Sequence, residues 1–240
     1  MSSPRGIARP ARAFALLAAL AWMPSSGAHQ GEPVAEPDFI PPAPGTYMLH
    51  RIMAAPEGRV LGIDGRPQPL SRYTRGQITL LGFIYTTCSD REGCPLAFRV
   101  FDGLKDAIVA TPALHGKVRF VTLSFDPERD APNVMRRYAG SRATEKDAAL
   151  RWTFLTTRSA RELMPLVEGF GQDIQITYDR STGHPRRELS HVLKVFLIDG
   201  AGDVREIYSS MFLYPQLVLN DIETLLMEKD PPQGRVSVEK

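Results

Sequence analysis

The sequence predicts a single three-layer α/β domain, with a mixed central sheet, helices on both faces, and a β-hairpin and helix at the C-terminus. Two observations support this fold class. Gln77–Thr86 is a nearly continuous β-rich apolar run, which is typical of a strand buried on both faces of a sheet. Strand-like and helical segments then alternate before the hairpin and the final helix. This order favours a mixed sheet with a layer of helices on each side.

Helical periodicity and β-rich runs locate the individual elements. Tyr47–Ile63 has the character of short strands and leads into a turn at residues 64–67. Pro95–Ala110 has apolar side chains at helical spacing, which predicts a helix with Pro95 at its first position and Cys94 as its N-cap. The later elements are predicted in this order: strand Val118–Phe125, helix Asn133–Ala139, strand Trp152–Thr156, helix Ala160–Phe170 after Ser159, strands Val192–Ile198 and Val204–Tyr208 around a turn, and helix Gln216–Met227.

Residues 1–28 have the layout of a secretory signal peptide. Arg5, Arg9 and Arg12 precede the apolar run Ala13–Met23, and small residues up to Ala28 offer a cleavage site. The run is too short to cross a bilayer, which requires about 20 residues. Cleavage is therefore favoured over an uncleaved membrane anchor, and we expect an exported, periplasmic protein.

Composition divides the rest of the chain into three parts. Residues 29–45 are rich in Pro, Gly and Glu and are predicted to form an extended linker. Residues 46–229 are predicted to form one folded domain, because a chain of 240 residues with 43% apolar residues can build one ordinary core. Residues 230–240 are expected to be a flexible tail. A formal net charge of +2 gives no indication of a nucleic-acid-binding surface.

Cys88 and Cys94 are the only cysteines of the chain. They bound the loop between the predicted buried strand and the helix that follows, a position where α/β proteins collect ligands and chemistry. The helix N-terminus favours the Cys94 thiolate, Arg91 acts in the same direction, and the neighbouring acidic residues oppose it. In an exported protein such a pair can form a disulfide, remain a reactive dithiol or bind a metal.

Three segments occur as an ordered set. The first is Gly82–Pro95 (GFIYTTC…CP), the second is Ser124–Asp130 (SFDPERD) followed by Tyr138, and the third is Leu189–His191 before the strand VLKVFLID. Together they resemble the Sco/SenC family of thioredoxin-like copper chaperones for cytochrome c oxidase assembly, over about residues 40–228. The resemblance implies a thioredoxin-like fold and protein-to-protein copper transfer rather than catalysis in the ordinary sense.

The resemblance also implies that Cys88, Cys94 and His191 bind a copper ion. Two thiolates and an imidazole are a soft donor set, suited to Cu(I) and acceptable to Cu(II). The implied partner is the copper-site subunit of a respiratory oxidase or another periplasmic copper protein. One feature departs from the family, which usually has three residues between its cysteines, whereas the chain has the longer spacing C-x5-C. A longer loop can change copper affinity, redox potential or partner.

Other candidate residues have weaker support. Asp126 is a secondary site residue that could orient the cysteine loop, although an Asp before Pro127 is commonly a turn residue. His184 lies in a stretch rich in Gly, Pro and Arg, which predicts an exposed loop. Tyr85 and Phe125, like other aromatic residues of the strands, are interpreted as core residues. The remaining histidines and methionines show no metal-binding spacing and are interpreted as surface or core residues: His29, His50, His115, Met135, Met164 and Met211.

Two other functions remain open at the level of sequence. In a thiol–disulfide oxidoreductase or thiol peroxidase, Cys88 and Cys94 would be the catalytic residues, one attacking and the other resolving, and His191 would be dispensable. The C-x-x-C spacing of ordinary thioredoxins is absent, which disfavours this function. In a binding module the two cysteines would form a permanent disulfide, and its short loop would stabilise the fold only modestly.

Overall fold

The computed structural model describes residues 36–88, 90–143, 149–179 and 186–228. The predicted signal peptide (1–28), the predicted tail (230–240) and the first part of the predicted linker (29–35) lie outside the described residues. Within the described part of the chain, no helix combines the length and the apolar character needed to cross a membrane.

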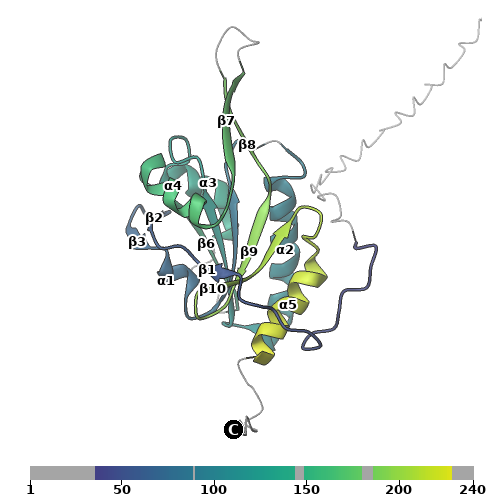
Figure 1. Cartoon of the computed structure of the whole chain (residues 1–240). Helices are drawn as coiled ribbons and strands as arrows, with labels where there is room; N and C mark the ends of the chain where they lie inside the picture. Colours follow the sequence, from purple (N-terminus) through teal and green to yellow (C-terminus); the bar gives the residue numbers. More distant parts are fainter. Residues whose placement is uncertain (1–35, 89, 144–148, 180–185, 229–240) are drawn as a thin grey trace, which may run out of the picture. The chain divides into compact units, whose positions relative to one another are not determined.

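A mixed eight-stranded sheet forms the centre of the domain (Figure 1). The strands of the described residues are β1 (Met53–Ala54), β2 (Arg59–Gly62), β3 (Pro67–Pro69), β4 (Ile78–Ile84), β5 (Val118–Ser124), β6 (Arg151–Thr156), β7 (Ile174–Asp179), β8 (Arg186–His191), β9 (Lys194–Ile198) and β10 (Asp203–Ser209). The order across the sheet is β1-β10-β9-β4-β5-β6-β2-β3. The central strand β4 pairs in parallel with β5 and antiparallel with β9, while β7 and β8 pair only with each other.

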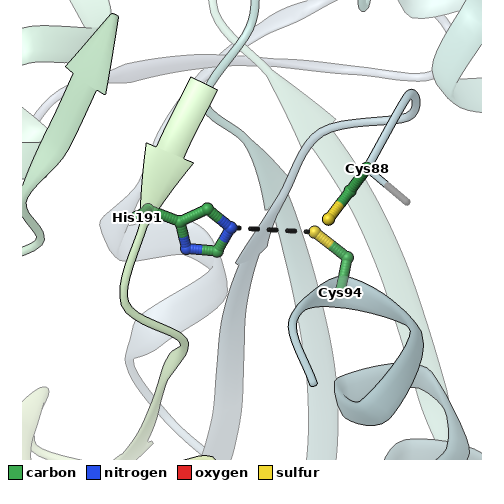
Figure 2. Close-up of side chains that lie close together, drawn as sticks. All are labelled: Cys88, Cys94 and His191. Atoms are coloured by element: carbon green, nitrogen blue, oxygen red, sulfur yellow. Dashed lines mark hydrogen bonds between the residues drawn. The ribbon is translucent and has the colours of Figure 1, made fainter. Parts of the chain in front are cut away.

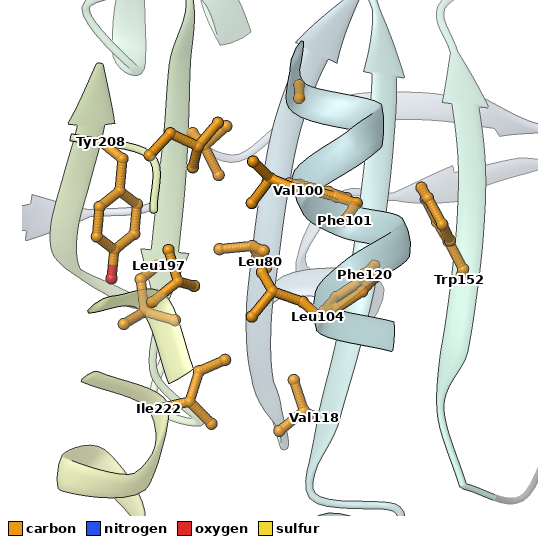
Figure 3. Close-up of a cluster of buried hydrophobic side chains, with 14 of the residues drawn as sticks. Leu80, Val100, Phe101, Leu104, Val118, Phe120, Trp152, Leu197, Tyr208 and Ile222 are labelled. Atoms are coloured by element: carbon orange, nitrogen blue, oxygen red, sulfur yellow. The ribbon is translucent and has the colours of Figure 1, made fainter. Parts of the chain in front are cut away.

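Helices cover both faces of this sheet, as predicted. They are α1 (Ser71–Thr74), α2 (Cys94–Ala110), α3 (Pro132–Ala139), α4 (Ala160–Gly169) and α5 (Pro215–Glu228), with short 3-10 turns at Pro112–Leu114 and Gly140–Arg142. Helices α2, α3 and α5 pack on one face, against a core that includes Leu80, Phe120 and Trp152 (Figure 3). Helix α4 packs on the other face, against a second core that includes Leu81 and Phe83. The predicted fold class is therefore confirmed.

Strand β4 confirms the predicted buried strand. All seven of its residues are buried. Side chains of a strand alternate between faces, so Leu80 joins the core under α2 while Phe83 joins the core under α4. Gly82 lies beneath α2, where a Cβ atom would come within 3.3 Å of the Phe101 ring. The ring therefore packs directly on the backbone of β4.

Helix α2 begins one residue earlier than the sequence predicts. The Ala97 amide donates to the Gly93 carbonyl at 3.2 Å, so Gly93 is the N-cap and Cys94 is the first helical residue. The prediction of Cys94 as the N-cap is therefore wrong. A thiol is a weak hydrogen-bond acceptor, whereas glycine adopts the non-helical backbone of this position without a side-chain penalty.

The hairpin of β7 and β8 has no counterpart in the sequence prediction. It extends beyond the end of the main sheet (Figure 1). Strand β7 has an alternating apolar pattern at Ile174 and Ile176, but β8 has Leu189 as its one aliphatic residue, so no paired strand signal stands out. His184, predicted to lie in an exposed loop, is outside the described residues. Because β8 runs to His191, strand β9 begins at residue 194 rather than at the predicted 192.

The remaining predicted elements are present at nearly the predicted bounds. In helix α4, a side-chain N-cap fixes the first of these bounds. Ser159 is its N-cap, and the Ser159 hydroxyl oxygen accepts a hydrogen bond from the Glu162 amide at 3.4 Å. The helix continues through Pro165, the predicted weak point.

The segment before β1 is tied to helix α5. Asn220 donates through Nδ2 to the Pro42 carbonyl at 2.8 Å, within the predicted linker. The hydroxyl groups of Tyr47 and Tyr208 both donate to the buried carboxyl of Asp221, at 2.5 and 2.6 Å. These bonds join the N-terminal segment, β10 and α5.

Replacing Phe101 with Ala should destabilise the domain strongly. The Phe101 ring centroid lies 5.1 Å from that of Phe120 and 5.6 Å from that of Trp152. The change leaves a cavity, so we expect a loss of about 3–5 kcal/mol in the free energy of unfolding, measured by urea denaturation. Met164→Ala, at an exposed position of α4, is the control and should change stability by less than about 0.5 kcal/mol. Equal losses in the two variants would contradict the placement of Phe101 in the core.

Candidate metal centre

The loop between β4 and α2 is folded by its own hydrogen bonds. The Cys88 amide donates to the Tyr85 carbonyl at 3.1 Å, and the Gly93 amide donates to the Asp90 carbonyl at 3.1 Å. The Asp90 carboxyl also accepts from the Glu92 amide at 3.1 Å. These tight turns take up the extra residues of the C-x5-C spacing, so the loop returns Cys94 to the neighbourhood of Cys88.

The three predicted ligands lie together. One potential ligand atom from each of Cys88, Cys94 and His191 lies within 4.8 Å of the other two. Figure 2 shows the imidazole directed at the sulfur atoms, with Nε2 of His191 at 3.9 Å from Sγ of Cys94. Both cysteines are free thiols. Residues about a hundred positions apart in the sequence thus form one cluster beyond the carboxyl end of β4.

Aromatic side chains and one hydrogen bond place the histidine. The Tyr85 hydroxyl donates to the Leu189 carbonyl at 3.0 Å, which ties β8 to the end of β4. The His191 ring packs edge-on against Phe125 and Tyr85, with centroid distances of 4.5 and 5.9 Å. Nδ1 of His191 is buried and has no hydrogen-bond partner within the described residues. The ring is therefore held by packing, with Nε2 left to face the sulfur atoms.

The two thiols have opposite environments. Cys94 is fully buried and Cys88 is half-buried. The hydrogen bond from the Cys94 thiol lowers the pKa of Cys88, and a hydrogen bond from His191 acts in the same direction against the effect of burial. The contact with Cys88, together with burial, raises the pKa of Cys94. Within the pair, Cys88 therefore ionises more readily than Cys94.

The sequence analysis did not identify every residue that contacts the cluster. It interpreted Tyr85 and Phe125 as core residues, but both rings contact His191. It selected Asp126, which is buried and whose amide donates to the Ser124 hydroxyl oxygen at 3.0 Å. Asp130, four residues later, accepts a hydrogen bond from the Thr86 amide at the beginning of the cysteine loop. Tyr85 and Phe125 directly follow the parallel strands β4 and β5, which end at the same edge of the sheet. This position in the sequence was the signal that could have identified them as neighbours of the cluster.

The other histidines and methionines do not join the cluster where the structure describes them. His50 and His115 are exposed, and Nε2 of His115 lies 2.9 Å from the Val109 carbonyl oxygen. Met135 is buried in the core, whereas Met164 and Met211 are exposed. His29 lies outside the described residues.

The mixed sheet with helices on both faces is a thioredoxin-like domain. Two thiols and an imidazole converge at the end of its central strands and form a candidate site for a soft metal ion. The family model described as SCO1/SenC matches residues 64–227, a range that includes all three side chains. The chain belongs to the SCO1/SenC family.

Several solved structures have the same fold. The structure of Arabidopsis thaliana ScoI with copper bound is 19% identical, with a TM-score of 0.57, and covers 73% of this chain and 99% of that one. A SCO1/SenC family lipoprotein from Bacillus anthracis is 21% identical, with a TM-score of 0.57, and covers 72% and 95%. BsSco, a member of the Sco family of cytochrome c oxidase assembly proteins, is 21% identical, with a TM-score of 0.54, and covers 73% and 95%. No curated protein sequence matches the chain.

In the reduced, metal-free protein, iodoacetamide should modify Cys88 before Cys94. Cys88 is the more exposed thiol, and its lowered pKa keeps it ionised under acidic conditions. Peptide mass spectrometry after timed labelling at about pH 5.5 measures the order. The Cys94→Ala variant loses the donor that lowers the Cys88 pKa, so Cys88 labelling at this pH should slow by about tenfold or more. Faster labelling of Cys94, or an unchanged Cys88 rate in the variant, would contradict this description of the pair.

Proposed function

We propose that the protein is an exported copper-binding assembly factor, which delivers copper to a respiratory oxidase copper site or maintains the thiols of that site. The observation that carries the proposal is the cluster of Cys88, Cys94 and His191 in a chain of the SCO1/SenC family. In this function copper is the cargo, and the three side chains are its ligands.

The chemistry of the cluster fits copper. Two sulfur donors and one imidazole nitrogen are the ligands that Cu(I) prefers, and the same set can accept Cu(II). Cys88 already favours the thiolate form that a metal requires. Three protein donors leave a coordination position for a ligand of the acceptor protein. The half-buried Cys88 is the side from which such a ligand can approach.

The solved relatives support both parts of the proposal. The Arabidopsis thaliana protein was crystallised with copper bound, and BsSco belongs to a family of cytochrome c oxidase assembly proteins. We therefore infer that the partner is the copper-site subunit of a respiratory oxidase, with another periplasmic copper protein as the alternative.

Two observations support export of the protein. Residues 1–28 have the pattern of a signal peptide, and the Bacillus anthracis relative is a lipoprotein. We infer a periplasmic location, with cleavage after Ala28.

The lowered pKa of Cys88 also favours a second candidate function. A half-buried thiolate beside a buried thiol is the arrangement that attacks and resolves disulfides. In this thiol–disulfide oxidoreductase or thiol peroxidase, Cys88 would attack the substrate sulfur or oxygen and Cys94 would resolve the intermediate. His191 would not be required for turnover.

Anaerobic copper titration of the reduced protein without residues 1–28 tests the proposed function. We expect stoichiometric copper uptake by the unsubstituted protein, because all three donors already lie together. Cys88→Ser and His191→Ala should each weaken binding by about tenfold or more and change the copper absorption spectrum. His50→Ala, at an exposed position, is the matched control and should bind as the unsubstituted protein does.

The same variants separate the two functions. Unchanged copper stoichiometry and spectra in His191→Ala would remove His191 from the ligand set. Turnover of a disulfide or peroxide substrate by metal-free protein, retained in His191→Ala and lost in Cys88→Ser, would favour the oxidoreductase. Absence of both copper uptake and turnover would reject both functions.

A further inference from the structure

Asp130 is a buried acidic residue that accepts hydrogen bonds from Thr86, at the start of the cysteine loop, and from Ser124, at the end of β5. Its side chain is among the most buried polar groups of the described residues, with a relative exposure of 1%. One carboxyl oxygen, Oδ2, accepts from the Thr86 amide at 3.0 Å and from the Ser124 hydroxyl at 2.5 Å. The other oxygen, Oδ1, accepts from the Thr86 hydroxyl. Two of these three donors belong to Thr86.

The parallel pairing of β4 and β5 explains why these groups meet. Ile84 and Ser124 are paired as the last residues of the two strands. The chain after β4 therefore leaves the sheet beside the chain after β5. The Asp130 amide donates to the Asp126 carbonyl at 2.8 Å, a turn that brings the Asp130 carboxyl back over the strand ends. Thr86 is fixed there through both its backbone and its side chain.

The hydrogen bonds between Thr86 and Asp130 form an anchor for the loop. Thr86 lies two residues before Cys88, so this anchor fixes the direction in which the loop leaves the sheet. The next bond along the chain is the one from the Cys88 amide to the Tyr85 carbonyl. A backbone held at both Tyr85 and Thr86 leaves Cys88 little freedom to move away from Cys94. By contrast, Cys94 is held independently by helix α2. The separation of the two sulfur atoms thus depends on what holds the Cys88 side of the loop.

We propose that Asp130 is a positioning residue for Cys88, which keeps the two thiols in contact in the reduced protein. In the dithiol form the anchor keeps the Cys88 sulfur within 4.8 Å of the Cys94 sulfur, so little loop freedom is lost when the disulfide forms. Without the anchor the reduced loop gains freedom, which disulfide formation must then remove. Loss of the anchor should therefore disfavour the disulfide and shift the equilibrium toward the dithiol. Its effect on copper binding rests on the proposed function, whereas its effect on the disulfide does not.

Asp130→Asn tests this role against a matched buried aspartate. Asn keeps the size of the side chain but loses one acceptor, which leaves a donor of Thr86 or Ser124 without a partner. The control is Asp221→Asn, since Asp221 is 3% exposed and also accepts from two hydroxyl groups, those of Tyr47 and Tyr208. Both variants should have a lower free energy of unfolding in urea denaturation. The result for Asp221→Asn gives the effect expected from a structural role alone.

The decisive measurement is the dithiol–disulfide equilibrium of metal-free protein in dithiothreitol redox buffers, in which oxidised dithiothreitol takes up the two electrons and two protons of the thiols. We expect Asp130→Asn to shift this equilibrium toward the dithiol by about tenfold or more. Asp221→Asn should leave it unchanged. If copper binds as proposed, Asp130→Asn should also weaken binding by about 10–100-fold.

Substitutions of Thr86 provide a milder test that does not depend on Asp130→Asn folding. Thr86→Val removes the hydroxyl and should shift the dithiol–disulfide equilibrium in the same direction as Asp130→Asn. Thr86→Ser keeps the hydroxyl and should have the equilibrium of the unsubstituted protein. Equal equilibria in Asp130→Asn and Asp221→Asn, or in Thr86→Val and Thr86→Ser, would overturn the positioning role. A shift toward the dithiol in Asp130→Asn, together with no copper uptake by the unsubstituted protein, would instead overturn the copper function and leave the role of Asp130 intact.

Discussion

Strands β4 and β5 pair in parallel from Ile78–Ile84 and Val118–Ser124, and both strands end at the same edge of the sheet. This pairing determines where the chemistry of the protein can lie. The chain after β4 carries the cysteine loop, and the chain after β5 carries Phe125 and Asp130. Parallel strands place such loops side by side because their carboxyl ends coincide. The buried strand β4 therefore positions the site and also supplies side chains to the core.

The cluster combines side chains from a helix, a loop and a hairpin strand. Cys94 belongs to helix α2 and is fully buried in the main core. His191 ends the strand β8, whose hairpin lies outside the eight-stranded sheet and is tied to it by the Tyr85 hydroxyl. Cys88 lies in the loop between β4 and α2. Three separate elements must therefore be held in place to bring the donors within 4.8 Å of one another.

The longer cysteine spacing changes the loop more than it changes the site. The turn closed by Asp90 and the N-cap Gly93 absorb the additional residues before the helix begins. A Cβ at Gly93 would lie 3.4 Å from the Cys88 sulfur and 3.3 Å from the Asp90 carbonyl oxygen, so glycine keeps this turn compact. The sulfur atoms remain close enough to share a hydrogen bond, and the separation in sequence has no simple relation to their separation in space.

The sequence by itself determined the fold class and most elements, because burial and periodicity are local properties of the chain. Its resemblance to the Sco/SenC family implied the three clustered side chains, which the structure brings together. The sequence missed the β7–β8 hairpin, since β8 lacks an apolar pattern, and it placed Cys94 at the wrong helical position. Only the tertiary structure decided that Tyr85 and Phe125 contact His191 and that Asp130, beyond Asp126, reaches Thr86. These contacts depend on strand register and on how two loops leave one sheet edge, which no local pattern encodes.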